Sequence, residues 1–265
     1  MPSVSDLDTL AQQRTRRALI GAGVIIVILV AIVALLLSGS GPAPAPSPPP
    51  PVGAGTAPPA LAPPPPPASA SPPASDGYVP PQRWTALPNG TLLLKRTYRV
   101  GFPRTPQGAA AAAAAMFQSV WHLDPARATG AVQVYFAPAD QNSFRAHAVT
   151  NTRWMRQQIG LSPEGELPPD ASVAVQVTGV QWRIVDASNV LVSVNMTLDL
   201  LAGVGAPLHT LPAASTAHLR WHPNVRGGDW LVVQDSSQQM PRPEHAELGT
   251  AAFNAAGWLG IRPGG

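Results

Sequence analysis

The residues whose types and spacing come closest to a chemical site are His218, Arg220 and His222, which alternate along one expected β-strand and therefore share a face. On an extended strand the two histidines lie about 13 Å apart, at about 3.3 Å per residue, which is too far for one zinc ion to join them. We therefore expect no metal site here. We interpret the three residues as part of a polar sheet face that could line a dimer interface.

The other chemically active side chains favour structural roles. Glu164 and Glu166 lie in a Pro- and Gly-rich loop, where solvated charges are the simpler interpretation, and turn chemistry explains Asp229. The chain has no Cys, no P-loop, no H-E-x-x-H helix and no G-x-S-x-G nucleophile elbow. We therefore expect no catalytic residues, no metal and no cofactor.

The N-terminal part carries a membrane signal. Residues 18–37 are an unbroken run of 20 residues without a polar side chain, and as a helix they would be about 30 Å long, the thickness of a hydrocarbon core. The run exceeds the apolar region of a cleaved signal peptide, so we expect a signal-anchor, a single transmembrane helix. Arg14, Arg16 and Arg17 precede it, and the positive-inside rule places the tail 1–17 in the cytoplasm and the rest outside the cell. The lipid bilayer is then the first expected partner.

Residues 38–84 are a proline-rich linker. The stretch 41–75 holds 16 Pro in 35 residues, with Ala, Ser and Gly between them. Such a composition favours polyproline II and lacks the apolar mass for a core, so we expect a disordered spacer between the anchor and a folded outer domain at 85–265.

The outer domain begins with helical signals. Thr105-Pro106 and Asp124-Pro125 each place a capping residue before a Pro at the first helical position. A third helix is expected from Ala137-Pro138 to Gly160, and a last one over 244–256.

Alternating apolar residues then predict four strands, at about 172–185, 190–200, 214–222 and 229–235. The apolar phase switches near Thr178-Gly179, which predicts a β-bulge. One further strand is expected over 91–100. Helices followed by a strand meander predict an α+β fold, with three helices packed on one face of a curved antiparallel sheet of about four strands.

Three pieces of this domain resemble a group of actinobacterial membrane proteins, many of them associated with integrative or conjugative elements. They are the helix start Gly101-Phe102-Pro103-Arg104-Thr105-Pro106-Gln107-Gly108-Ala109-Ala110, the late strand ending in Trp221, and Gly227-Gly228-Asp229-Trp230-Leu231. The architecture is also similar to the VirB8/TcpC family, in which an inner-membrane anchor carries an NTF2-like domain. The long proline-rich spacer departs from compact VirB8 proteins.

The resemblance implies a membrane-anchored, extracytoplasmic structural or interaction subunit of a conjugation or type IV secretion-like apparatus, acting as a homo-oligomer or with other apparatus proteins. Two alternatives stay open: a small-ligand module, such as an accessory protein of a Mce-type lipid importer, and an enzyme using Asp140, His147 or Tyr135. Beyond residue 75 there are 14 basic and 12 acidic residues, a balance of +2 without a basic stripe, so we expect no nucleic-acid partner.

Overall fold

The computed structural model describes residues 77–262 of the chain, apart from 236 and 242. Four helices lie in this part, and three of them begin after a residue whose side chain caps the first turn. Asp124 Oδ1, for example, accepts a hydrogen bond from Ala126 N at 2.8 Å, which satisfies a backbone donor that a helix start leaves without a partner. The helices are α2 (Pro106–Val120), α3 (Pro125–Tyr135), α4 (Gln141–Gln158) and α5 (Ala251–Ala255).

Six strands form one mixed sheet in the order β1-β8-β4-β5-β6-β7, and β2 and β3 form a separate antiparallel pair. Within the large sheet β1 and β8 run parallel, and all other neighbours run antiparallel. The strands are β1 (Trp84–Thr85), β2 (Leu92–Leu94), β3 (Tyr98–Val100), β4 (Ser172–Asp186), β5 (Asn189–Leu201), β6 (Leu208–His222), β7 (Asp229–Val232) and β8 (Leu259–Ile261).

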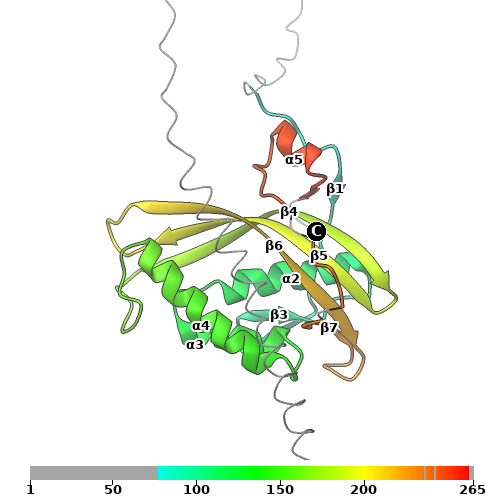
Figure 1. The fold of residues 1–265 in the computed structure, drawn as a ribbon, viewed down its shortest axis with the longest axis horizontal. Coiled ribbons are helices and arrows are strands. Elements are labelled where there is room, and N and C mark those ends of the chain that lie inside the picture. The colour runs from blue at the N-terminus through cyan, green and yellow to red at the C-terminus, as the bar shows by residue number, and fades with distance from the viewer. Residues whose placement is uncertain (1–76, 236, 242, 263–265) are drawn as a thin grey trace, which may run out of the picture. The chain divides into compact units, whose positions relative to one another are not determined.

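The helices α2, α3 and α4 lie on one side of the large sheet, and α5 lies on the other side (Figure 1). The alanines 109–114 of α2 are all buried, and small side chains let this helix approach β4 and β5 closely. The inner face of β5 meets them with Val192, Met196 and Leu200, each of which has no exposed surface. Helix and sheet thus share one continuous apolar core.

The chain segment after β7 crosses the outer face of the sheet. Its main anchor is Asn195, which is fully buried: Nδ2 donates to Ala246 O at 2.8 Å, and Oδ1 accepts from Ala246 N at 3.2 Å. Thr216 Oγ1 donates to Pro241 O at 3.0 Å. We call residues 239–250, apart from 242, the strap. It leads into α5 and then into β8, which pairs with the edge of β4.

The predicted β-bulge is confirmed, since the register of β4 against β5 shifts between Val177 and Gly179. Glycine is required at this position because Phe253 of α5 packs directly on it: an added Cβ at Gly179 would lie 2.8 Å from Phe253 Cζ. The caps of α2 and α3 are also found where the sequence placed them.

Several predicted elements need correction. The third helix, α4, begins at Gln141 rather than at Ala137, because Ala137 N donates to Val232 O beside β7. The helix expected over 244–256 shrinks to α5, because both backbone polar groups of Ala246 bond to Asn195. The strand expected over 91–100 is the hairpin β2–β3, which turns at Lys95 and Arg96.

The predicted fold class was also wrong. In place of an NTF2-like arrangement of three helices on about four antiparallel strands, the structure has four helices, a mixed sheet of six strands and a second sheet of two. No helix within the described residues is long and apolar enough to cross a membrane. None of the described helices is therefore the transmembrane helix that the sequence led us to expect. The tail 1–17, the run 18–37 and residues 38–76 of the linker expected over 38–84 lie outside the described part.

Candidate functional site

The predicted interface residues His218, Arg220 and His222 do share the outer face of β6, but they differ in exposure. His218 is only 2% exposed, and its Nε2 lies 3.2 Å from Asn189 Oδ1. Arg220 donates from Nε to the same oxygen at 2.8 Å, and its Nη2 lies 3.4 Å from Asp235 Oδ2. The Arg220 side chain is 43% exposed. An interface at this place would therefore contact Arg220, with His218 supporting it from below.

Burial is the main influence on the pKa of both histidines, His218 and His222. It lowers the pKa of His218 and of His222 below the ordinary value for histidine, since a charged imidazole loses hydration there. His218 Nδ1 and His222 Nε2 are buried without a hydrogen-bond partner in the described part of the chain. Burial thus favours the neutral form of both imidazole rings beside the Arg220 guanidinium.

The three sequence pieces behind the family resemblance meet at one joint. Asp229 is 1% exposed, and its carboxylate accepts hydrogen bonds from Gly101 N at 2.9 Å and from Arg226 Nε at 2.9 Å. Trp230 Nε1 donates a hydrogen bond to Pro103 O at 2.9 Å. The Trp230 ring packs edge-on against the Trp221 ring, with 5.4 Å between the ring centroids. Asp229 therefore does more than end a turn: it ties β7 to the segment that leads into α2.

The side chains considered for an enzyme do not converge on one another. Tyr135 donates its hydroxyl to Arg99 O at 2.9 Å, and Asp140 Oδ2 accepts from Gln234 N at 3.0 Å. The His147 ring packs edge-on against the Phe144 ring, with 6.3 Å between the ring centroids. Burial raises the pKa of Tyr135 and lowers that of His147. No hydrogen bond or ion pair joins any two of these three side chains in the described part of the chain. No cluster of three metal-ligating side chains occurs in the described part either.

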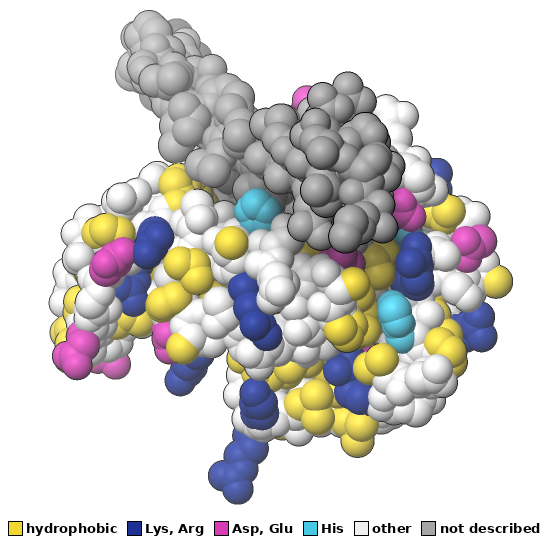
Figure 2. All heavy atoms as spheres, turned by 60° about the horizontal axis from the view of Figure 1, so that its bottom comes forward, with side chains coloured by type: hydrophobic (Ala, Val, Ile, Leu, Met, Phe, Trp, Pro, Cys, Tyr) yellow, Lys and Arg dark blue, Asp and Glu magenta, His cyan; other side chains and the backbone are white. Residues whose placement is uncertain are grey.

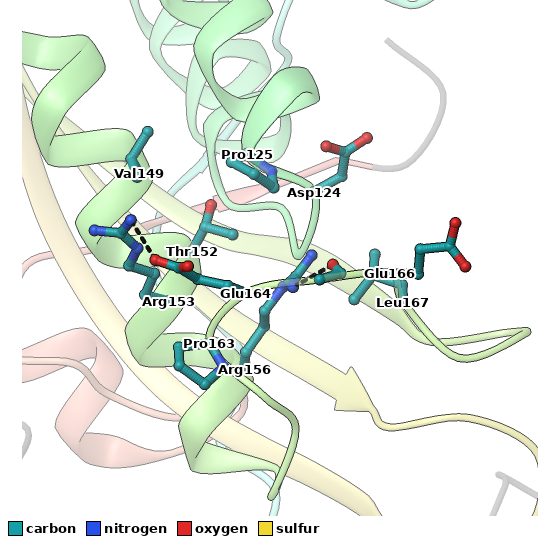
Figure 3. A pocket seen from close by; sticks show the side chains of 11 residues that line it. Asp124, Pro125, Val149, Thr152, Arg153, Arg156, Pro163, Glu164, Glu166 and Leu167 are labelled. Atoms are coloured by element: carbon teal, nitrogen blue, oxygen red, sulfur yellow. Dashed lines mark hydrogen bonds and ion pairs between the residues drawn. The ribbon is translucent and has the colours of Figure 1, made fainter.

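A cavity of about 710 Å³ lies between the end of α4, the start of α3 and the loop 161–171 (Figure 3). Its innermost polar residue is Arg156, which is 3% exposed. Arg156 donates from Nε to Leu123 O at 2.7 Å and from Nη1 to Gly165 O at 2.9 Å. The lining residues are Asp124, Pro125, Val149, Thr152, Arg153, Arg156, Pro163, Glu164, Gly165, Glu166 and Leu167.

Charges of both signs surround this cavity. Arg153 Nη2 and Glu164 Oε1 form an exposed ion pair at 2.7 Å. Glu166 makes no ion pair with any residue that the structure describes, and in Figure 3 its carboxylate points outward at the rim. Sequence reasoning missed Arg156. A signal existed, since it follows the buried positions Ala148 and Thr152 at intervals of four residues and thus interrupts an apolar side of α4 with a charge.

The sheet also has a free edge. In β6 only 219–222 pair with β7, so that no described strand pairs with the outer edge of 208–217. The β5–β6 turn at the end of this edge carries Val204, which is 80% exposed, and Leu208 at the start of β6 is 61% exposed. Large apolar side chains beside unpaired strand groups are features of surfaces that pair with other chains.

Charged side chains do not single out another surface in Figure 2. On the face shown there, Lys and Arg side chains are scattered among small hydrophobic patches. A scan against models of protein families, a search of curated proteins and a search of solved structures each find no match.

Proposed function

We propose that this chain is a non-catalytic structural or interaction subunit, and that the domain described here binds a second copy or another subunit along the free edge of β6. The assembly we propose is a conjugation or type IV secretion-like apparatus, as the resemblance implies. The free edge carries this proposal, because no described strand pairs with the outer edge of 208–217, and exposed Val204 and Leu208 lie at its start.

The filled interior supports an interaction role over the small-ligand alternative. The alanine side of α2 packs close to the sheet, and the core between them is continuous. The 710 Å³ cavity lies outside this core, at the end of α4 and the adjoining loop. A lipid carrier would need its apolar chamber between helices and sheet.

The test compares lysine substitutions at the two ends of the sheet in the full-length chain. Val204→Lys with Leu208→Lys places charges at the free edge, where they block strand pairing. Ile184→Lys is the matched control, because Ile184 is 57% exposed but lies at the β4–β5 end. Chemical crosslinking in the cells that make the protein, followed by pull-down, measures association.

We expect the double variant to lose crosslinked species and co-purified apparatus components, and Ile184→Lys to retain them. Arg220→Glu in the same assay decides whether the interface reaches the His218 region. If the double variant associates as strongly as the wild-type protein, the free edge of β6 is not the binding surface. A pull-down of wild-type protein that recovers neither a second copy nor a secretion or conjugation component would refute the assembly role.

A further inference from the structure

We propose that the cavity beside Arg156 binds a zwitterionic ligand of the size of a short peptide, with its carboxylate on Arg156 and its ammonium group among the acidic residues of the rim. The inference is independent of the assembly role, since it uses different residues. It follows from the charge and shape of the wall.

Arg156 is a buried cation without a counter-ion. No carboxylate lies within ion-pair distance of it among the described residues. A guanidinium has five N–H donors, and only Nε and Nη1 have acceptors, which are the carbonyl oxygens of Leu123 and Gly165. The carbonyl ends of α4 offset part of its charge. Nη2 has no hydrogen-bond acceptor among the described residues, and Figure 3 shows the guanidinium beside the Gly165 backbone at the wall of the cavity. Nη2 can therefore donate hydrogen bonds to a ligand carboxylate.

The rim has the opposite charge. Two arginines against three carboxylates give the lining a net charge of −1. Arg153 and Glu164 neutralise each other at 2.7 Å, which leaves the Arg156 guanidinium at the wall and the carboxylates of Asp124 and Glu166 at the rim. Asp124 uses Oδ1 to cap α3, so its second oxygen remains for a ligand.

These charges select the ligand class. A dianion such as phosphate would be repelled by the two rim carboxylates, and a simple cation would leave Arg156 without a partner. A molecule with a carboxylate at one end and an ammonium group at the other satisfies both. Val149, Leu167 and the prolines 125 and 163 supply apolar wall for a short aliphatic side chain. A volume of about 710 Å³ lies within the range of small-molecule sites.

Arg156 also holds the loop 161–171 through its hydrogen bond to Gly165 O, so a purely structural role for Arg156 is the alternative. Changes to the ligand separate the binding role from the structural role, because they leave the protein intact. The full-length chain is titrated by calorimetry with the dipeptide Ala-Leu, with N-acetyl-Ala-Leu, with Ala-Leu amide and with inorganic phosphate. We expect Ala-Leu to bind with a Kd on the order of 1 mM or tighter, and either cap to weaken binding about tenfold or more.

Two protein variants complete the test. Glu166→Gln changes an exposed rim residue and should weaken Ala-Leu about threefold to tenfold, with little effect on N-acetyl-Ala-Leu, which lacks the ammonium group. Glu247→Gln, an exposed carboxylate of the strap, is the matched control and should leave binding unchanged. Absence of Ala-Leu binding at about 10 mM, equal binding of the capped peptides, or tighter binding of phosphate would overturn the proposal and leave Arg156 as a loop fastener.

Discussion

Replacing Asn195 with alanine should release the strap from the sheet. The Asn195 side chain bonds to both backbone polar groups of Ala246, with its Nδ2 2.8 Å from the carbonyl oxygen and its Oδ1 3.2 Å from the amide nitrogen. Ala246 is itself only 7% exposed. Each buried group left without a partner costs about 1–3 kcal/mol, so the two together predict a loss of about 2–6 kcal/mol in the free energy of unfolding.

The matched control is Ser193→Ala, two residues earlier on the same face. Ser193 is also buried but makes one hydrogen bond, to Thr216 Oγ1 at 2.7 Å, so its loss should cost about 1 kcal/mol. Urea unfolding measures the difference, and hydrogen exchange should show faster exchange over the strap, α5 and β8 in Asn195→Ala alone. Equal destabilisation by the two substitutions, or unchanged exchange in the strap, would refute the view that Asn195 holds this segment.

Two further predictions concern the joint and the buried histidines. Asp229→Asn should lower the free energy of unfolding by about 3 kcal/mol, because it leaves the half-buried Arg226 without its counter-ion. The control Glu247→Gln should change the free energy of unfolding by less than about 0.5 kcal/mol. Urea unfolding measures both variants. Burial lowers the pKa of His218 in the folded state, so the unfolded chain binds the proton first. The free energy of unfolding should therefore decrease as the pH is lowered from about 7.5 to about 5.5. Urea unfolding repeated across this range should show a weaker pH dependence for His218→Gln than for the wild-type protein. An unchanged pH dependence would exclude His218 as a contributor.

Local signals explain which elements the sequence could predict. The starts of α2 and α3 depend on Thr105 and Asp124, whose caps are complete within three residues. The bulge at Gly179 is visible as a change of alternation in β4 itself. These features need no distant partner, so sequence patterns are sufficient for them.

The missed elements depend on contacts far along the chain. The short strand β8 exists because it pairs with both β1 and β4, and residues 244–248 avoid a helix because Asn195 takes the hydrogen bonds of Ala246. The turn of the β2–β3 hairpin has Lys95 and Arg96 at positive φ, a conformation for which Asn and Gly are the usual signals. Local propensity therefore pointed away from each of these structures.

The candidate sites follow the same division. Alternation along β6 correctly placed His218, Arg220 and His222 on one face, but the network with Asn189 and Asp235 that sets their exposure could not be inferred from it. Arg156 was missed because its burial depends on the loop 161–171 and on the segment before α3.

The joint around Asp229 contains the sequence pieces that resemble the actinobacterial membrane proteins. Its quoted pieces, the segment before α2, Trp221 and Asp229-Trp230, contact one another through buried hydrogen bonds and ring packing. Residues of that kind are needed to close β7 onto the start of α2, whatever the domain binds. A likeness in these pieces therefore speaks for a shared way of joining elements, since function resides in sites carried by the fold. The free edge of β6 and the cavity beside Arg156 lie apart from this joint, and experiments on function should begin there.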